Sequence, residues 1–524
     1  MTAIKKSTIP FLVAVAIAIF VFLKNAWVSE DAYIIFRSIE QLFEGNGPVW
    51  NPHERVQVFT SPLWYFMLAF VRMFSRDAYL NVIAASFILW VATNLVLKKV
   101  FKNNMILLIS ILLFSSSTAF FDYTSSGLEN VLAYLIIALY ILNYIELFAF
   151  RDSDKTQISA KNRIKMILFL FGLIICVRHD LALLLLPSTI YVVLKNSRIY
   201  SLKQWSVISV TAFLPIILFS IFSLIYYGFP FPNTAYAKLN TGIDKAEIFK
   251  QGLQYFKSSF KFDTITLPII AGALVLNTVA SSNKCLRYLG YGVFLNLLYI
   301  VYIGGDFMQG RLFSYAYMVS AIILLLRFTR VHSNKYRLIT LVMVCLYLVF
   351  YSHTPFKSPL DYNNRTIESG IADERGFFFD ILSLYRYTHR DKEGKIFPDC
   401  PEAYQGLKFK NTPNSITAAA SIGVFGYYAG TENIIIDPLG LSDPLLARMP
   451  VTGKWRIGHF KRELPEGYAK SIITDNEVIA DPRINEYYRK LKIVTQNEEL
   501  FTAERLKTII LFNAGAYNHL LSDE

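Results

Sequence analysis

Long apolar runs recur between residues 9 and 350, and they restrict the possible folds more than any other feature of the sequence. The runs are about 15 to 24 residues long, and a helix needs roughly 20 apolar residues to cross a bilayer. The hydrophobic fraction of 54% and the mean hydropathy of +0.38 also exceed those of a soluble globular protein. Residues 354–524 instead read as ordinary water-soluble sequence. The sequence therefore predicts a polytopic α-helical membrane protein, with a transmembrane domain over residues 1–353 and a soluble domain over residues 354–524.

About eleven runs are candidate transmembrane helices. Several are shorter than a straight span requires, so their ends are expected to extend into neighbouring polar sequence. The run at residues 62–74 is left out, because it holds about a dozen apolar residues and carries Arg72 near its end. Such a run suits a helix lying at the membrane surface. The candidate spans are residues 10–28, 80–97, 105–121, 128–150, 164–177, 181–194, 205–227, 264–280, 289–303, 313–326 and 338–350.

Basic residues gather between the apolar runs, and with this set of spans the clusters fall on one side of the membrane. The positive-inside rule makes that side the cytoplasm. The N-terminus, with an uncleaved first helix, is then cytoplasmic, and the soluble domain lies outside. The clusters account for the net charge of +13, so no nucleic-acid partner is expected. An exception is residues 228–263, which place five lysines outside. The clusters are Lys5/Lys6, Lys98/Lys99/Lys102, residues 151–165, Lys195/Arg198/Lys203, Lys284/Arg287 and residues 327–337.

The soluble part alternates short apolar runs with helix-like stretches, which predicts a small mixed α/β domain. The runs are SIGVFGYYAG, NIIIDPLG, KSIITDN, KIVTQ and KTIILF. Residues 437–468 between them are rich in Pro, Gly, Arg and His, a composition typical of an ordered functional loop. The chain has four cysteines, of which Cys400 alone lies in the soluble part, so we expect no intramolecular disulfide framework.

The first outer segment, residues 29–79, holds the adjacent acids Glu30 and Asp31 close to the membrane surface. Adjacent side chains on a helix diverge by about 100°, so one carboxylate is expected to act on the substrate and the other to support it. Asp31 is the candidate general base that takes a proton from an acceptor hydroxyl. The alternative is a structural role, since carboxylates also stabilise helix N-termini.

Three arginines, Arg37, Arg178 and Arg311, lie on or near the predicted outer face, and arginine forks bind phosphate well. Arg178 stands with His179 at a turn between two short apolar runs, at the depth of a lipid phosphate. For each arginine the alternative is snorkelling or pairing with a nearby carboxylate. We expect the arginines and the acids of the first outer segment to share one pocket at the outer leaflet.

Further polar residues in the outer loops and in the soluble part are candidate substrate ligands. Glu129 and Asp306 stand at predicted helix ends in loops that contain glycine, where they either position sugar hydroxyls or cap helices. No Walker loop, HExxH, GxSxG or Cys/His zinc spacing occurs in a credible context. No metal or other cofactor is therefore predicted, although a divalent metal is not excluded. The remaining candidate substrate ligands are Tyr33, Asp180, Asn233, Lys238, Asp437 and His459.

Several segments together resemble a known family. EDAYIIFR, GNGPVWNPHERV and TSPLW in the first outer segment are similar to the corresponding loop of bacterial GT-C glycosyltransferases related to the mycobacterial terminal β-(1→2)-arabinofuranosyltransferase. The likeness continues in the same order through SSGLEN, VRHDLALLLLP, FPFPNTAYAK, GGDFMQGRLF, IIIDPLGLSDPLLAR and GHFKRELPEGY. Two positions depart from the family pattern: Glu30 replaces the first acid of a pair, and His179 replaces a proline.

The resemblance implies a GT-C architecture in a bacterial inner membrane, with a periplasmic C-terminal domain. It also implies a polyprenyl-phosphate sugar donor, an active site at the outer leaflet and a carboxylate base in the first outer loop. We therefore expect inverting transfer of a monosaccharide, with arabinofuranose as one candidate, to a glycan, glycolipid or glycoprotein of the cell envelope. The alternatives are the same chemistry on a protein acceptor such as pilin, or a transporter of lipid-linked sugar.

Overall fold

The structure, a computed structural model, describes residues 9–149, 154–239, 241–279, 283–329, 334–390, 395–474, 476 and 478–521. Lys5 and Lys6, and parts of the predicted basic clusters at 151–165 and 327–337, lie outside the described residues. The chain packs as two units, each built from separate stretches of sequence. Unit 1 comprises residues up to Ser29, Tyr79–Ile216 and Ala246–His389, and unit 2 comprises Glu30–Ala78, Ile217–Lys245 and the residues from Arg390 onward.

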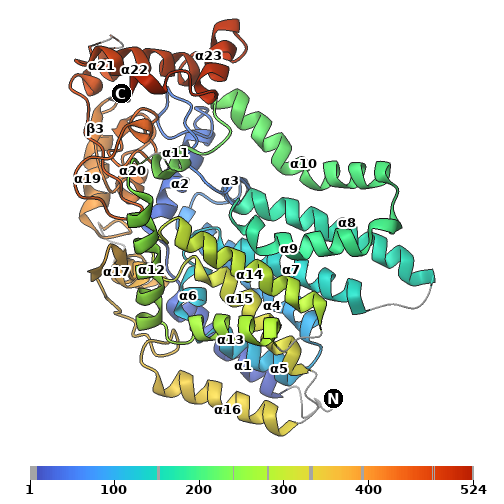
Figure 1. Ribbon diagram of the computed structural model, residues 1–524. Coiled ribbons are helices and arrows are strands. Elements are labelled where there is room, and N and C mark those ends of the chain that lie inside the picture. The colour runs from blue at the N-terminus through green and yellow to red at the C-terminus, as the bar shows by residue number, and fades with distance from the viewer. Residues whose placement is uncertain are drawn as a thin grey trace. The chain divides into compact units, whose positions relative to one another are not determined.

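Unit 1 is a helical assembly in which α13, α14 and α15 pack side by side and α14 also packs on α9 (Figure 1). Its helices are α1 (Ile9–Asn25), α4 (Ala78–Phe101), α5 (Asn104–Phe114), α6 (Thr118–Phe121), η1 (Asp122–Thr124), α7 (Asn130–Ala149), α8 (Asp154–Val177), α9 (Leu181–Lys195), η2 (Ser197–Ile199), the first part of α10 (Leu202–Tyr226), α12 (Lys245–Phe262), α13 (Thr266–Val279), α14 (Lys284–Tyr302), α15 (Phe313–Thr329), α16 (Asn334–Phe350), α17 (Glu374–Leu382) and α18 (Leu384–Thr388). The short strands β1 (Ile367–Glu368) and β2 (Ile371–Ala372) pair antiparallel.

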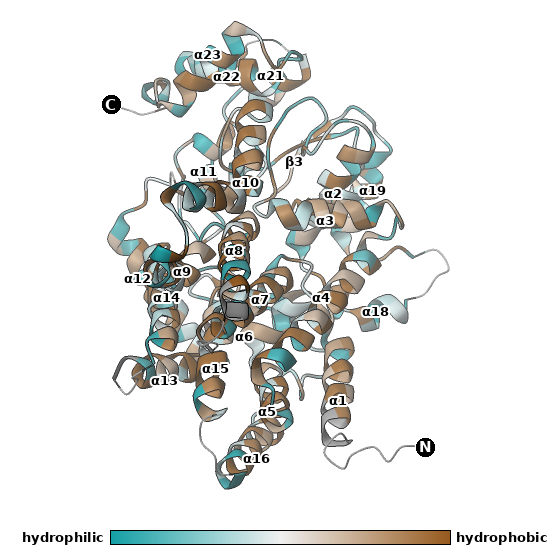
Figure 2. Ribbon diagram, turned by 90° about the vertical axis from the view of Figure 1, so that its right-hand side faces the viewer, coloured by the Kyte–Doolittle hydropathy of each residue, from teal (hydrophilic) through white to brown (hydrophobic). Residues whose placement is uncertain are grey.

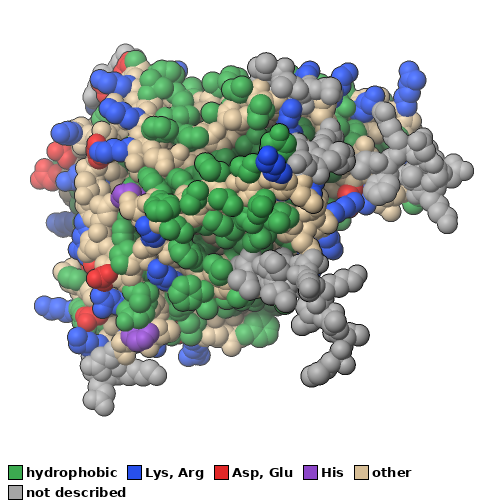
Figure 3. All heavy atoms as spheres, turned by 90° about the horizontal axis from the view of Figure 1, so that it is seen from below, with side chains coloured by type: hydrophobic (Ala, Val, Ile, Leu, Met, Phe, Trp, Pro, Cys, Tyr) green, Lys and Arg blue, Asp and Glu red, His purple; other side chains and the backbone are tan. Residues whose placement is uncertain are grey.

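Several helices of the described chain are long and apolar enough to cross a membrane, and hydropathy colours α5, α10 and α15 mostly brown (Figure 2). Four qualify alone, namely α4, α7, α10 and α14, and the number rises to six if each of two bent helix pairs is one span. Hydrophobic side chains also gather over the face seen in Figure 3. Every predicted span overlaps one helix or a pair of helices in the described residues, which confirms a membrane protein of several apolar helices. The number of eleven spans and their orientation stay predictions.

Two of the predicted spans belong to bent helix pairs. The range 105–121 holds α5 and α6, with a bend of 86°, and α13 follows α12 with a bend of 110°. Both breaks meet at the buried Asp263, whose Oδ2 accepts hydrogen bonds from the hydroxyls of Ser117, Thr118 and Thr266 and from the backbone N–H of Ala119. A buried carboxylate needs such partners, so Asp263 joins the two breaks.

Close helix packing in unit 1 depends on glycine. Gly292 on α14 faces the backbone of α9, and a Cβ there would stand 1.8 Å from the carbonyl oxygen of Leu184. Gly252 on α12 likewise faces Val301, whose carbonyl oxygen would lie 2.4 Å from an added Cβ. Small residues allow helix backbones to approach at such distances. These contacts fix the ends of α9 and α14, next to which the charged residues described below are found.

Unit 2 is mainly helical, with one parallel pair of three-residue strands in which Ile416 pairs with Ile434. Its elements are α2 (Glu30–Phe43), α3 (Pro62–Arg72), the end of α10, α11 (Asn233–Leu239), α19 (Pro401–Lys410), β3 (Ile416–Ala418), α20 (Gly423–Tyr428), β4 (Ile434–Ile436), η3 (Leu446–Arg448), α21 (Tyr468–Thr474), α22 (Pro482–Thr495), α23 (Ala503–Asn513) and η4 (Asn518–Leu520). The helix predicted at residues 62–74 is present as α3, and its place at a membrane surface stays a prediction.

The mixed α/β expectation for the soluble part is only partly right. Of the five apolar runs, NIIIDPLG alone forms a strand, β4, whereas the others lie in α20, α21, α22 and α23. Helices α21, α22 and α23 bury an apolar core that includes Leu491, Val494 and Ile509. Short apolar runs fit a buried helix face as well as a strand, and here tertiary packing decided the outcome. The predicted domain boundary at residue 353 is not tested by the division into two units.

Candidate active site

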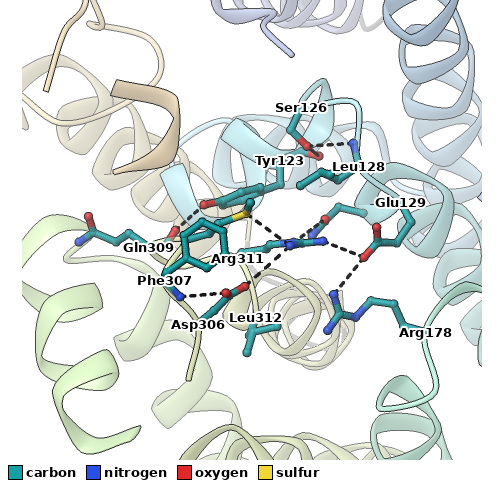
Figure 4. A network of polar contacts seen from close by, with 12 residues as sticks. Tyr123, Ser126, Leu128, Glu129, Arg178, Asp306, Phe307, Gln309, Arg311 and Leu312 are labelled. Carbon is teal, nitrogen blue, oxygen red and sulfur yellow. Dashed lines mark hydrogen bonds and ion pairs between the residues drawn. The ribbon is translucent and has the colours of Figure 1, made fainter. Parts of the chain in front are cut away.

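A cluster of ionised side chains joins three separate segments of unit 1 (Figure 4). Arg178 Nη1 and Arg311 Nη2 both donate to Oε1 of Glu129, each at 2.9 Å. The Glu129 side chain is only 3% exposed, whereas those of Arg178 and Arg311 are 18% and 11% exposed. Two guanidinium groups therefore share one buried carboxylate and remain partly open to solvent.

Local sequence explains how these side chains are placed. Glu129 directly precedes α7, Arg178 lies between α8 and α9, and Arg311 lies in the loop before α15. That loop turns at Gly304, Gly305 and Gly310, all with positive φ, a conformation that glycine adopts without steric cost. The predicted motifs SSGLEN, VRHD and GGDFMQGR thus supply the ends of helices that meet in unit 1.

Electrostatics keep the cluster charged. Burial alone would raise the pKa of Glu129, but the positive charges of Arg311 and Arg178 outweigh it and lower that pKa below its ordinary value. Burial likewise opposes the charge on Arg311, and the nearby Glu129 carboxylate reverses the effect, so that the pKa of Arg311 is raised. Glu129 is therefore an ionised group that holds two arginines together.

Asp180 and Asp306 complete the cluster. Asp180 binds Arg178 through both carboxylate oxygens, at 3.0 and 3.1 Å, and Asp306 lies 3.8 Å from Nη1 of Arg311. Both arginines thus pair with nearby carboxylates, which was the alternative to phosphate binding given for them in the sequence analysis. The contacts of Arg178 use three of its five N–H groups, so donors are left for a further anion. His179 is exposed.

Tyr315, in the first turn of α15, belongs to this site but was not predicted. Its ring lies under the guanidinium of Arg178, with 5.8 Å between Arg178 Cζ and the ring centroid. Its hydroxyl is buried and has no hydrogen-bond partner among the described residues. A buried hydroxyl without a partner is costly unless water or a ligand satisfies it. The sequence offers no signal for this role, because Tyr315 stands within an apolar run.

The acidic pair of the first outer segment begins α2 in unit 2. Glu30 Oε1 accepts the backbone N–H of Val424, at the start of α20, at 3.1 Å. Burial, reinforced by the charge of Asp31, raises the pKa of Glu30 to about 8. Asp31 is half-buried in the same first turn. Glu30 is thus engaged by the backbone of α20, while the roles of the two acids in catalysis, with Asp31 as base, stay predictions.

Arg37 has contacts that argue against the phosphate-binding role predicted for it. Its side chain is buried, and its guanidinium donates to the backbone carbonyls of Trp50, Gly426, Gly430 and Asn433. Four of its five N–H groups are thus used inside unit 2. This is a structural contact between α2 and the segment after α20, and neither of the alternatives weighed from the sequence included it.

The other predicted ligands in unit 2 are held by structural contacts or lie at its surface. Asn233 donates to three carbonyls, those of Gly440, Leu441 and Asp443. Asp437 is buried and accepts the N–H groups of residues 439, 441 and 442. Tyr33 is buried, with ring contacts to Phe36 and Tyr427, His459 is half-buried, and Lys238 is exposed. Substrate contacts at these positions stay predictions.

The predicted site residues fall into both units. Arg178, His179, Asp180, Glu129, Asp306 and Arg311 lie in unit 1, while Glu30, Asp31, Tyr33, Arg37, Asn233, Lys238, Asp437 and His459 lie in unit 2. The structure brings Arg178 and Arg311 together, and a pocket shared with Asp31 stays a prediction. Among the described residues, no three His, Cys, Asp or Glu side chains are grouped to hold a metal ion.

Fold and site together define a membrane protein with a partly open arginine–carboxylate cluster at its helix ends. No family model matches the chain. It is 24% identical to the terminal β-(1→2)-arabinofuranosyltransferase of Mycobacterium tuberculosis, over 84% of this chain and 82% of the relative. It is 26% identical to the enzyme of the same name from Corynebacterium glutamicum, over 73% of this chain and 59% of the relative. These matches confirm the resemblance seen in the sequence and, with it, the class of enzyme, a glycosyltransferase.

Among solved structures, the chain is similar to ArnT from Cupriavidus metallidurans, which was crystallised with undecaprenyl phosphate. The TM-score is 0.45 and the sequence identity 12%, over 83% of this chain and 76% of ArnT.

Proposed function

We propose that the chain transfers a monosaccharide from a polyprenyl-phosphate donor to an acceptor of the cell envelope at the outer face of the inner membrane. The observation that carries this proposal is the pair of arginines, Arg178 and Arg311, held by one buried carboxylate and left partly open. The curated relatives are named as transferring arabinofuranose, so that sugar is the first to test.

The two guanidinium groups of the cluster suit a phosphodiester donor. When the bond from sugar to phosphate breaks, the leaving polyprenyl phosphate gains a second negative charge, and guanidinium groups stabilise that charge best when they are fixed beforehand. Three carboxylates, Glu129, Asp180 and Asp306, surround the two arginines, so a bound phosphate uses the N–H groups that they leave free and competes with the weaker carboxylate contacts. The 3.8 Å contact of Asp306 is the weakest, and Asp180 lies at the more exposed arginine.

Asp31 is proposed as the general base that deprotonates the acceptor hydroxyl during inverting attack. The resemblance of EDAYIIFR to the first outer loop of the GT-C family supports this assignment, and so does the half-buried position of Asp31 in the first turn of α2. Glu30, engaged by Val424, is the supporting acid.

The test is an assay of the purified full chain with synthetic polyprenyl-phosphate pentoses and hexoses, measuring release of polyprenyl phosphate and formation of glycosylated acceptor. We expect turnover with one sugar class, a large loss in Arg178→Gln and Arg311→Gln, and little change in the exposed control Arg76→Gln. If the wild-type chain instead moved intact donor across the proteoliposome membrane without cleaving the bond between sugar and phosphate, the chain would be a transporter. A glycan and a protein acceptor are compared in the same assay.

A further inference from the structure

Helix α12 carries three distinct faces along its length, and only one of them is buried. The first face, Gly252, Tyr255 and Ser259, is buried. Tyr255 donates its hydroxyl to the carbonyl of Met308 at 3.0 Å, and Phe256 packs edge-on against Phe313 at the margin of this face. This face holds α12 against the loop that carries Arg311.

The second face is apolar and exposed. Phe249, Leu253 and Phe260 are 53%, 52% and 55% exposed. At 100° per residue these three side chains fall within about 40° of one another around the helix. One exposed hydrophobic side chain needs no explanation, but a stripe along a helix marks a surface that another apolar phase covers.

The third face is basic and adjoins the apolar stripe. Lys250, Lys257 and Lys261 are exposed and also fall within about 40° of one another, centred about 80° from the stripe. Lys261 pairs with the exposed Glu368 at 2.8 Å, and Glu247 is an exposed acid in the first turn. An apolar stripe bordered by lysines is the pattern of a helix lying in the surface of a membrane.

The geometry of the neighbouring helices agrees with that placement. The bend of 110° between α12 and the apolar α13 means that, where α13 follows the membrane normal, α12 lies within about 20° of the membrane plane. Gly252 packs on the last turn of α14, a helix of spanning length. That turn ends at Tyr302, which is 68% exposed, and tyrosine is enriched where a span meets the headgroups.

We propose that α12 lies in the membrane interface, with Phe249, Leu253 and Phe260 at the boundary of the acyl chains and Lys250 and Lys257 against anionic headgroup phosphates. Lysines on the outer side were an exception to the positive-inside rule. Binding to headgroups gives those of α12 a function there. Because lipid is the partner, the inference is independent of the sugar and of the acceptor. The surface also places a helix in contact with lipid directly beside the loop of Arg311.

The experiment uses nitroxide labels on the full chain in proteoliposomes, in a background with Cys285→Ala and Cys345→Ala. Labels at Leu253→Cys and Phe260→Cys are compared with Lys408→Cys, an exposed position on α19. Power saturation measures collisions with oxygen, which concentrates in lipid, and with a water-soluble nickel chelate. We expect a ratio of oxygen to nickel collisions several-fold higher at 253 and 260 than at 408.

Lipid composition tests the role of the lysines. In vesicles of phosphatidylcholine mixed with phosphatidylglycerol, whose negative surface charge attracts polybasic segments, the ratio at 253 should exceed that in phosphatidylcholine alone. Lys250→Gln with Lys257→Gln should reduce that difference. A ratio at 253 equal to that at 408 would overturn the proposal, and so would shielding from both reagents, which would indicate a protein partner or a second copy. Loss of glycosyl transfer with intact collision ratios would instead count against the proposed function alone.

Discussion

Arg178 and Arg311 donate to the same oxygen atom, Oε1 of Glu129, at equal distances of 2.9 Å. Their segments are far apart in the sequence, and their like charges would repel one another without this carboxylate. The position of each guanidinium thus depends on Glu129, and so does any phosphate that the two arginines bind together.

Replacing Glu129 tests this dependence. Glu129→Gln leaves two largely buried arginines with less compensation, and breaking a buried ion pair costs about 3–5 kcal/mol. We expect a lower unfolding temperature and weaker donor binding, measured by thermal denaturation and by titration with polyprenyl phosphate. Glu146→Gln is the matched control, since Glu146 also pairs with an arginine, Arg163, but is 22% exposed. Unchanged donor binding in Glu129→Gln would contradict the proposed role of the cluster.

The two acids at the start of α2 should respond differently to substitution. Asp31→Asn should reduce kcat about 10²- to 10⁴-fold, the usual contribution of a general base, with donor binding retained. Glu30→Gln keeps an oxygen that can accept the N–H of Val424, so its kcat should fall much less. Turnover and donor binding are measured for both variants. A loss of turnover confined to Glu30→Gln would make Glu30, and not Asp31, the general base.

Arg37 should matter for stability and not for donor binding. Arg37→Lys cannot donate to all four carbonyls now bound, and a buried carbonyl left unsatisfied costs about 1–3 kcal/mol. We expect a clear drop in the unfolding temperature and an unchanged KM for the donor in the protein that remains folded. Arg76→Lys, at an exposed position, should show neither effect. A raised KM at normal stability would restore the phosphate-binding role predicted from the sequence.

Glu54 should make stability depend on pH. Burial, with the charge of Asp443 added, raises its pKa from an ordinary 4.5 to about 8 in the folded chain. The folded state then holds a proton that the unfolded state has released, so stability falls as pH rises from about 4.5 through 8. Glu54→Gln should flatten this part of the pH profile of the unfolding temperature, and the exposed control Glu44→Gln should not. An unchanged slope in Glu54→Gln would refute the assignment.

Helix positions were readable from the sequence because lipid-spanning runs carry a strong signal. Every predicted span overlaps one helix or a pair of helices in the described residues, and the acids of residues 30 and 31 begin a helix. The bends could not be predicted, since they depend on Asp263 meeting hydroxyls about 150 residues away in the chain, as in its bond to Ser117. The contacts of Arg37 with carbonyls around residue 430 were equally hidden, because backbone groups leave no pattern in side-chain identity.

The candidate site was predicted only in part, because some of its residues give a strong sequence signal and others depend on the fold. Charged residues in apolar surroundings, such as Arg178 and Arg311, stand out and were identified. Their common partner Glu129 was named as a sugar ligand or a helix cap, and its bridging role required the fold. Tyr315 was missed because a tyrosine within an apolar run gives no indication of which way its hydroxyl points.

The tight contact of Gly292 with the backbone of Leu184 also affects the position of the charged residues before α9. Leu184 lies one turn into α9, and Arg178 and Asp180 immediately precede that helix. A single methyl group at position 292 would push the start of α9 and, with it, Arg178, one of the two arginines proposed to bind phosphate. An inactive variant recovered from random mutagenesis can therefore carry its lesion at a buried, uncharged glycine inside the helical packing.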